Sequence, residues 1–536
     1  MTAKVLVVGF DACEVSLVER WAFAGRLPNF ARLHSRSRAF DLDSPMTSLP
    51  GAIWPEISTG RAASRDAHFY IPQQLHSGET RSRATRPDEI DPEHFFWTVA
   101  SRAGCRVAVI DPVQAILAPR LNGVQLIEWG LHDRTFTVQS DPPEFLDDVR
   151  ARHGDHPVQS CDRHGETAAG YRGLLQGLLT GVRAKGKFAS ALLAREPWDL
   201  FHCTISESHC AGHQLWHFTD PRHPWHTRAI QPDLRDALFD VYCGIDAALG
   251  KLLDAAGDDA RVLAVFSHGM DLYYDGPQLL PEFLARLGYA SGGRPTAGIW
   301  MRTLRRYVTY LPRPVKAVIK RAARSRALHR PIAAAGCLVD PFQSRDTRAA
   351  QVSNNRCGGI RLNLRGREPY GSIEPGIEAQ RALAELSREL RALRDPKSDE
   401  PIVADVFTAD ARFGADRHRD LPDLMCVFRT DLGRLERCES PAVGHIYAPI
   451  YHPHAPRTGD HTPHSACWAS GNGIVPSKDG GRGNVRDIAP TVLALLNVAR
   501  PGWMDGTALD VVAKAPSPSP SPSPSPSPSA SAYREP

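Results

Sequence analysis

The chain has 536 residues, 42% of them hydrophobic, so it suits one large or two fused domains with a sizeable core. Its 64 Lys and Arg residues nearly balance 60 Asp and Glu residues, and the formal net charge of +4 disfavours a dedicated binder of nucleic-acid polymers. The 22 histidines are not explained by low-complexity sequence and are the feature to follow.

Short β-rich apolar runs alternate with longer stretches of helical periodicity. In chain order the predicted elements are a strand at 4–10, helices at 15–21 and 28–34, a strand at 107–110, a helix at 171–193, and strands at 200–205, 262–266 and 424–428. This alternation predicts an α/β domain with a largely parallel sheet. Ligands bind at the carboxyl ends of such strands, so we expect Asp11, residues 207–213 and Ser267-His268 at the functional site.

Two segments break this pattern. Residues 302–330 carry ten Lys and Arg residues and no acidic residue, which fits either an amphipathic segment that contacts anionic lipid or substrate, or a solvated helix in a cap insertion. Pro312 and Pro314 interrupt the helical period and favour the second interpretation. Residues 516–529 are seven Pro-Ser repeats, which predict a disordered tail.

No targeting or membrane segment is indicated. The apolar stretch near the N-terminus is too short for the core of a signal peptide. No run approaches the roughly 18 to 20 apolar residues of a membrane span. The 11 cysteines contain no CxxC pair, so neither a cysteine-rich zinc site nor a disulfide framework is signalled. We therefore expect a cytoplasmic protein without stable membrane insertion.

Asp11, Thr47 and Ser48 are candidates for metal binding or for nucleophilic catalysis. Asp11 directly follows the first strand, where it could bind a metal or only cap the next helix. Thr47 and Ser48 precede a Pro-Gly turn and a helix-like stretch. A hydroxyl at a helix N-terminus can serve as a nucleophile, or it can be an ordinary N-cap.

Histidines cluster after two of the predicted strands. His209 and His213 are four residues apart, so on a helix they share one face and can bind one ion. His268 follows the strand at 262–266. A Gly- and Pro-containing segment carries four more, at positions 452, 454, 461 and 464. A zinc site needs three or four such nitrogen or oxygen ligands.

Taken in order, these segments resemble the alkaline-phosphatase superfamily, specifically its type I phosphodiesterase/nucleotide pyrophosphatase branch, from about Lys4 to Leu509. Residues 359–371 look like the family's GIRINLKGREPxG segment, and residues 422–424 fit its PDL strand. Residues 487–506 match its C-terminal helix and closing strand. The resemblance implies a three-layer sandwich with a central, mostly parallel sheet.

The implied domain organisation is one alkaline-phosphatase-like catalytic domain over residues 1–512 with a cap insertion at about 290–350. Residues 513–536 form the disordered tail. The resemblance also implies two divalent metals, most often zinc, on either side of a Thr or Ser nucleophile. Counting back from Gly60 reaches Pro50, which cannot attack, whereas anchoring on Pro50-Gly51 places Ser48 at the nucleophile position with Thr47 in reserve.

The implied metal ligands depart from the family pattern. One site has His209, His213 and His461, with His209 in place of the family's Asp. This all-imidazole set suits zinc. The other site keeps Asp11, Ser48 and His268 but has Ser267 where the family has a metal-binding Asp. The loss of two anionic ligands would either favour a more anionic substrate, such as a monoester, or leave the second metal weakly bound or absent.

The implied activity is hydrolysis of a small phosphate ester or nucleotide-like substrate through a phosphoserine intermediate. Trp54, His132 and Glu207 are candidates for substrate contacts, and Glu207 could equally orient a histidine. The sequence does not distinguish monoesters from diesters and does not indicate an oligomeric state.

Other readings of the same fold remain open. Sulfatases need an Arg where this chain has Ala52, and a phosphoglycerate mutase needs a larger ligand set. A phosphonate hydrolase or a phospho-group transferase in a biosynthetic pathway could share the first half-reaction. The lost carboxylates also fit a catalytically degenerate member that only binds anionic ligands.

Overall fold

The computed structural model describes residues 3–511, apart from 67–86, 132–136, 159–166, 227–230, 275, 291–341, 343–344, 355–356, 434 and 449–456. Most of the predicted cap, the basic segment at 302–330 and the Pro-Ser repeats lie outside the described residues. His132, His452 and His454 lie outside them too.

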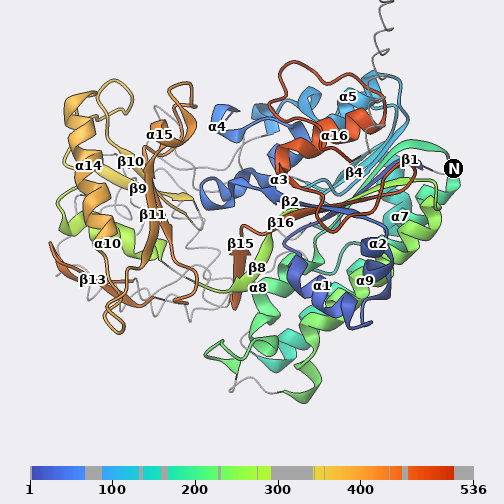
Figure 1. Cartoon of the computed structure of the whole chain (residues 1–536), viewed down its shortest axis with the longest axis horizontal. Helices are drawn as coiled ribbons and strands as arrows, with labels where there is room; N and C mark the ends of the chain where they lie inside the picture. The colour runs from blue at the N-terminus through green and yellow to red at the C-terminus, as the bar shows by residue number, and fades with distance from the viewer. Residues whose placement is uncertain are drawn as a thin grey trace, which may run out of the picture.

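A nine-stranded sheet forms the centre of the protein (Figure 1). Its order is β17-β2-β16-β7-β1-β6-β3-β4-β5, and the neighbours from β7 to β4 are all parallel. The strands are β1 (Ala3–Phe10), β2 (Arg38–Asp43), β3 (Val107–Ile110), β4 (Gly123–Ile127), β5 (Gln139–Asp141), β6 (Trp198–Ile205), β7 (Arg261–Phe266), β16 (Ser465–Ser470) and β17 (Arg482–Asn484). The predicted parallel α/β core is confirmed.

Helices cover both faces of this sheet and complete the three layers (Figure 1). One face carries α1 (Val15–Phe23), α2 (Pro28–Ser35), α7 (Ala168–Arg195), α8 (Glu207–Thr219) and α9 (Ala237–Ala256); the other carries α3 (Ile53–Thr59), α5 (Phe96–Arg102) and α16 (Ile488–Leu495). Beyond these lie α4 (Ala63–Asp66) and α6 (Pro143–His153).

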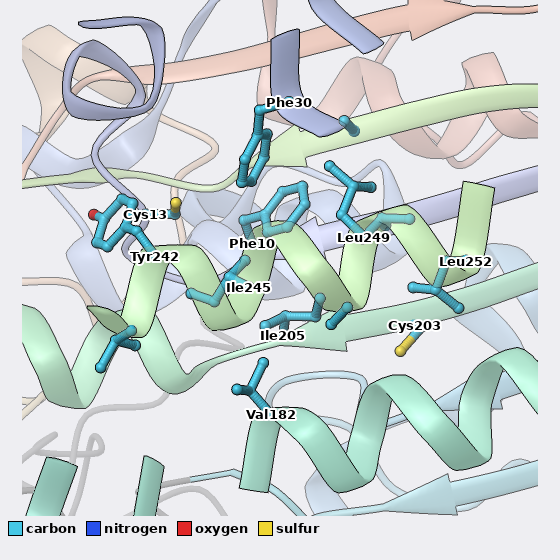
Figure 2. Close-up of a cluster of buried hydrophobic side chains, with 14 of the residues drawn as sticks. Phe10, Cys13, Phe30, Val182, Cys203, Ile205, Tyr242, Ile245, Leu249 and Leu252 are labelled. Atoms are coloured by element: carbon cyan, nitrogen blue, oxygen red, sulfur yellow. The ribbon is translucent and has the colours of Figure 1, made fainter. Parts of the chain in front are cut away.

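The central strands are buried on both faces because their side chains alternate between two apolar cores. In β1, Leu6, Val8 and Phe10 point into one core, whereas Val5 and Val7 point into the other. Figure 2 shows part of the first core, where Phe10 lies between the strands and the helix that carries Tyr242, Ile245, Leu249 and Leu252. The two-sided burial fixes where β1 ends, and therefore where Asp11 lies.

A second, smaller unit stands beside the sandwich (Figure 1). It contains an antiparallel sheet in the order β11-β12-β10-β9 and the two-stranded sheet β13-β14. Its elements are α10 (Leu280–Arg286), β9 (Ala349–Asn354), β10 (Cys357–Leu362), α14 (Ile377–Arg391), β11 (Val403–Thr408), α15 (Ala409–Phe413), β12 (Leu424–Phe428), β13 (Arg437–Ser440) and β14 (Gly444–Tyr447). The run at 424–428 is a strand as predicted, but it belongs to this sheet because it pairs with β10 and β11.

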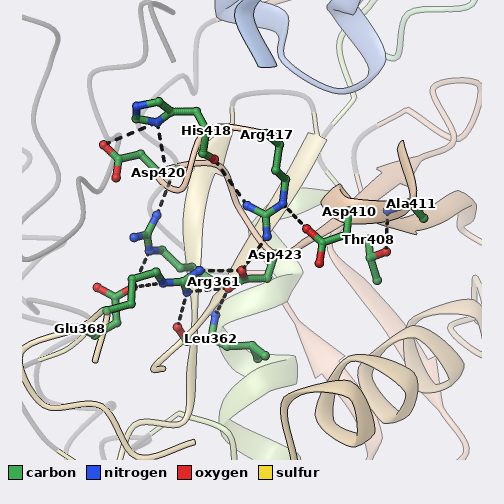
Figure 3. Close-up of polar contacts among 11 residues, drawn as sticks. Arg361, Leu362, Glu368, Thr408, Asp410, Ala411, Arg417, His418, Asp420 and Asp423 are labelled. Atoms are coloured by element: carbon green, nitrogen blue, oxygen red, sulfur yellow. Dashed lines mark hydrogen bonds and ion pairs between the residues drawn. The ribbon is translucent and has the colours of Figure 1, made fainter. Parts of the chain in front are cut away.

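A buried ionic network fixes the loop before β12 (Figure 3). The Asp423 carboxylate accepts hydrogen bonds from both terminal nitrogens of Arg367 at 2.7 Å and from the Leu362 amide at 2.8 Å. Arg361, fully buried, donates to Glu368 at 2.7 Å and to the Asp420 carbonyl at 2.8 Å. The family-like segments 359–371 and 422–424 therefore meet in three dimensions.

This loop also joins the two units. Leu421 and Met425 pack with Leu49, Ala52 and Ala63 of the sandwich in one small apolar cluster. Leu49 follows Ser48 in the chain, so the second unit buttresses the loop that carries the candidate nucleophile.

The end of the chain differs from its prediction. The helix expected after residue 487 is α16, but no strand forms at 504–511 within the described chain. Instead, the Asp505 and Gly506 amides both donate to the Gly60 carbonyl at 2.9 Å, at the C-terminus of α3. These amides are satisfied by a helix end rather than by a sheet edge.

Candidate metal centre and active site

The histidines come from two elements at the carboxyl edge of the central sheet. Helix α8 begins directly after β6 and carries His209 and His213 one turn apart. His461 lies on β15 (Gly459–Thr462), which pairs antiparallel with β8 (Gly269–Leu272), the strand that follows β7 and His268. Strands β6 and β7 flank β1, so these segments meet beside Asp11.

Three imidazoles converge at this edge. One ring nitrogen from each of His209, His213 and His461 lies within 4.8 Å of the other two. The Nε2 atoms of His209 and His461 are 2.7 Å apart, and all three side chains are buried. The sequence spacing predicted the shared face of the first two residues, and the structure brings them together with the third.

Backbone contacts set the orientation of His213. Its Nδ1 lies 2.8 Å from the Gly459 carbonyl, which requires Nδ1 to carry the proton and leaves Nε2 as the atom able to bind a metal. The Thr458 amide in turn donates to the His213 carbonyl at 2.6 Å. Helix α8 and the start of β15 are thus bonded to each other in both directions.

Glycine permits this close approach. A Cβ atom at Gly459 would lie 2.4 Å from the Gly212 carbonyl oxygen, which is backbone and cannot easily move. At Gly212 a Cβ would meet the side chain of Met270 at 2.7 Å. The close approach of α8 and β15 therefore depends on glycine at position 459, whereas at position 212 the flexible Met270 side chain could move aside.

The second predicted site is built differently. The indole Nε1 of Trp54 donates to Asp11 Oδ1 at 2.7 Å. Ser267 Oγ lies 3.4 Å from the same oxygen and 2.9 Å from His268 Nδ1, and His268 Nδ1 lies 4.0 Å from Asp11 Oδ1. Asp11, Ser267 and His268 are therefore together, with one carboxylate among them, and the buried indole of Trp54 orients that carboxylate.

His268 links the two groups of residues. Its ring centroid lies 4.4 Å from that of His461 and 6.1 Å from that of His209. Asp11, Ser267 and His268 thus adjoin the three converging histidines, whereas no contact joins Ser48, the other predicted ligand, to this centre among the contacts described.

Ser48 and Thr47 line a cavity of about 1050 Å³ between the sandwich and α15. Ser48 Oγ donates to the Pro45 carbonyl at 3.3 Å. Its neighbours in the cavity wall include Pro463, His464 and Ser465, which follow β15 closely in the chain. In the described part of the chain, the cavity lining contains none of the three converging histidines, so the nucleophile role of Ser48 stays a prediction.

Glu207 does not face this cavity. Its carboxylate is buried at the start of α8, 3.2 Å from His156 Nε2 and 3.7 Å from the Lys185 ammonium, which lies 3.1 Å from Asp111. Burial alone would raise the pKa of Glu207, but Lys185 and then His156 outweigh it and hold the pKa below its usual range. The histidine that Glu207 contacts is His156 rather than one of the three converging histidines, and both predicted roles of Glu207 stay predictions.

Sequence reasoning missed Lys185, Asp111 and His156. A signal for Lys185 was present, because it stands on the apolar face of the helix predicted at 171–193, at helical spacing from Leu178 and Val182. A lysine on such a face is buried with a partner or not at all. Its partners, far away in sequence, carried no comparable signal.

His464 was noted only as part of a histidine-rich segment. Its Nδ1 lies 3.0 Å from Glu14 Oε1, and this contact raises the pKa of the imidazole. Glu14 also accepts from the amide of Met270 in β8 at 2.9 Å. The pair ties the start of α1 to the strands that carry His268 and His461.

A comparison with protein-family models decides the family: the model described as type I phosphodiesterase / nucleotide pyrophosphatase matches residues 5–433. The chain belongs to this family. It is therefore a phosphoric ester hydrolase by class, as the sequence resemblance predicted. A comparison with curated proteins gave no match.

Solved structures of similar architecture are more distant. Wild-type alkaline phosphatase PafA is 11% identical, with a TM-score of 0.51 over 95% of this chain and 98% of that chain. Phosphonoacetate hydrolase from Sinorhizobium meliloti 1021 is 14% identical, with a TM-score of 0.47 over 93% and 96%. Murine ectonucleotide pyrophosphatase / phosphodiesterase 5 is 12% identical, with a TM-score of 0.44 over 95% and 100%. The first of these supports the alkaline-phosphatase-like fold.

Proposed function

We propose that this phosphodiesterase-family protein hydrolyses phosphate esters with a zinc ion at His209, His213 and His461 and with Ser48 as the nucleophile. The observation that carries the proposal is the convergence of these three imidazoles at the carboxyl edge of the central strands. Ligands bind at this edge in open α/β sheets.

The residues present fit zinc. The donor set is three neutral imidazoles, and three protein ligands with an open fourth position are typical of catalytic zinc sites. The hydrogen bond from His213 Nδ1 to the Gly459 carbonyl orients the ring as outer partners of zinc ligands do. When bound there, zinc would supply a Lewis acid and a water molecule of lowered pKa.

A second divalent ion has less to hold it. Asp11 is the carboxylate at that position, one of its oxygens already accepts from Trp54, and Ser267 offers a neutral hydroxyl. We propose that this half of the centre binds a second metal at best weakly. In this proposal, Asp11 and His268 chiefly shape the charge around the phosphate.

The chain's own residues would perform the displacement. Ser48 Oγ attacks phosphorus, the new Oγ–P bond forms as the P–O bond to the alcohol breaks, and the alcohol leaves with a proton. Water then cleaves the phosphoserine and regenerates the hydroxyl. Thr47 is the reserve nucleophile, because it lines the same cavity.

Binding without turnover is a second candidate function. It is favoured by one observation: Asp11 Oδ1, which lies 3.4 Å from Ser267 Oγ and 4.0 Å from His268 Nδ1, already accepts a hydrogen bond from Trp54 Nε1. Such a protein would bind phosphate-containing ligands at the histidine centre and release them unchanged.

Turnover of p-nitrophenyl phosphate and bis(p-nitrophenyl) phosphate, measured with added zinc or manganese, separates these functions. We expect hydrolysis of at least one ester by the wild-type protein and a loss of at least 100-fold in Ser48→Ala, with unchanged zinc content. Thr47→Ala is the matched control and should retain most activity. Equal activity of wild type and Ser48→Ala would remove Ser48 from the mechanism, and no turnover of any ester would favour the binding function.

The cellular location remains a proposal. We infer a cytoplasmic enzyme from the cysteine pattern of the sequence. Among the described helices, none combines the length and apolar character needed to cross a bilayer.

A further inference from the structure

Thr458 lies at the point where β15 meets the helix that carries His209 and His213. It directly precedes the first residue of β15 and is fully buried. Its amide donates to the His213 carbonyl at 2.6 Å, and its own carbonyl accepts from the Tyr273 amide at 3.1 Å. The backbone of this one residue therefore joins α8 to the chain just after β8.

The side chain of Thr458 reaches the same turn of α8. Its hydroxyl donates to the His213 carbonyl at 3.3 Å and accepts from the His217 amide at 3.4 Å. In an α-helix, a carbonyl and the amide four residues later are the two ends of one backbone hydrogen bond. The hydroxyl thus contacts both ends of this position in the helix, as an inserted side chain does.

The ring of His213 is held by the next residue of the same segment. Its Nδ1 lies 2.8 Å from the Gly459 carbonyl. The backbone and the ring of His213 are therefore bonded to two consecutive residues, Thr458 and Gly459. This arrangement fixes the position of the helical turn together with the rotation of the imidazole, and it leaves Nε2 as the atom able to bind a metal.

We propose that Thr458 is a positioning residue for the zinc site. Its hydroxyl sets where the turn of α8 that carries His213 lies against β15, so that this imidazole converges with those of His209 and His461. This inference rests on the proposed function, and in it Thr458 acts through His213 without touching the ion or the substrate. No pattern in the sequence indicates this role, because 245 positions separate Thr458 from His213.

Groups that orient a metal ligand affect the affinity of the site. Their loss typically weakens metal binding by about 10–100-fold. The amide of Thr458 and its hydrogen bond to the His213 carbonyl remain in any side-chain variant. Removal of the hydroxyl alone should therefore have an effect at the lower end of this range.

The test compares two substitutions of the same residue. Thr458→Val removes the hydroxyl and keeps the β-branched shape, whereas Thr458→Ser keeps the hydroxyl. We expect Thr458→Val to weaken zinc binding about tenfold, measured by competition with a chromophoric chelator, and Thr458→Ser to stay within about threefold of the wild type.

Thr491→Val is the matched control. Thr491 is equally buried, and its hydroxyl donates to the Asp487 carbonyl at 2.6 Å in α16, on the other face of the sheet. The control removes the same atoms from a helix contact that does not involve the histidines. It should change the zinc affinity less than about twofold.

Hydrogen exchange of the metal-free proteins gives a readout that does not need zinc. The amides of residues 207–219 should exchange faster in Thr458→Val than in the wild type, and at the wild-type rate in Thr458→Ser and Thr491→Val. This result supports the positioning of His213 by the hydroxyl even where the wild type binds no zinc, which would contradict only the proposed function. Urea unfolding of each variant shows whether it is folded.

Three results would overturn the inference. The first is a zinc affinity of Thr458→Val equal to that of a zinc-binding wild type, and the second is equal exchange of residues 207–219 in the two metal-free proteins. The third is a loss of zinc affinity in Thr458→Ser or Thr491→Val as large as that in Thr458→Val, because the hydroxyl at position 458 would then not be its cause.

Discussion

A buried lysine lies between two buried carboxylates close to the histidine centre. Lys185 is 1% exposed and lies between the carboxylates of Asp111 and Glu207, and it also donates to the Thr204 carbonyl at 3.1 Å. Glu207 is the first residue of α8, two positions before His209. The ammonium group therefore helps to hold the start of the helix that carries two metal-ligand candidates.

Replacing Lys185 with Met should leave two buried carboxylates without their cation. Breaking a buried pair from one side costs about 3–5 kcal/mol, so we expect a loss of that order in the free energy of unfolding, measured with urea. Lys187→Met, on the exposed side of the same helix, should change stability by less than about 0.5 kcal/mol. Similar losses in both variants would contradict the role given to Lys185.

Glu56 gives a pH-dependent prediction. Burial raises its pKa from 4.5 to about 7, with smaller opposing contributions from the Ala63 amide and Arg486. The folded pKa lies above the unfolded one, so stability is fully present below pH 4.5 and is lost as the pH rises through about 7. The loss is of the order of 3 kcal/mol.

Glu56→Gln removes this ionisation but keeps an acceptor for the Ala63 amide. We expect the variant to match the wild type near pH 4 to 5 and to become more stable than the wild type by about 2 to 3 kcal/mol at pH 8.5. Urea unfolding of both proteins across this range measures the difference. A difference that does not change with pH would show that Glu56 ionises normally in the folded protein.

At the scale of elements, the metal centre depends on how closely α8 approaches β15. A Cβ at Gly459 would meet a backbone oxygen at 2.4 Å, whereas a Cβ at Gly212 would meet the flexible side chain of Met270. Gly459→Ala must therefore move β15 and His461, while Gly212→Ala can be accommodated by a rotation of Met270.

We expect Gly459→Ala to weaken zinc binding at least tenfold, and Gly212→Ala to weaken it less than threefold. Competition with a chromophoric zinc chelator measures both affinities. If Gly212→Ala proved the more damaging of the two, the helix–strand contact would not be what positions the ligands.

The elements themselves were largely predictable. Runs such as 4–10 and 200–205 are strands because they are apolar, β-branched and buried on both faces, and His209 and His213 share a face because of their spacing. Their partner His461 was identified by its place in the family pattern. Spacing alone could not identify His461 as the third ligand, because it lies about 250 positions after His209 in the chain. The pairing of β15 with β8 brings it close to the other two histidines.

The sequence also did not indicate which strands pair with the predicted strand at 424–428. An apolar run predicts a strand but not its sheet, and here the antiparallel partners β10 and β11 place it in the second unit. The hydrogen bond between Trp54 and Asp11 and the ion pairs of Lys185 could not be predicted for the same reason, because each joins residues that are distant in sequence.

At the scale of the molecule, the two units meet at the loop that carries Ser48. Leu421 of the second unit packs on Leu49 and Ala52, and the Arg367–Asp423 network holds the chain just after it. The second unit therefore supports the candidate nucleophile from outside the sandwich and supplies part of the cavity wall.

Leu421→Ala tests this coupling. Removing a buried leucine costs about 2–5 kcal/mol, and here the void would open beside Leu49, so we expect kcat/KM to fall at least tenfold. Leu386→Ala, an equally buried leucine in α14 inside the second unit, should lose similar stability but less than threefold in kcat/KM. Equal activity losses would show that the effect comes from general destabilisation.

The most direct test of the three-imidazole centre is X-ray absorption at the zinc edge on the purified protein loaded with one equivalent of zinc. Three imidazole nitrogens at about 2.0–2.1 Å are expected, without sulfur at about 2.3 Å. His213→Ala should lose this imidazole signature, whereas His445→Ala, at an exposed histidine, should keep it. A zinc spectrum without imidazole ligands, or one unchanged in His213→Ala, would contradict the proposed centre.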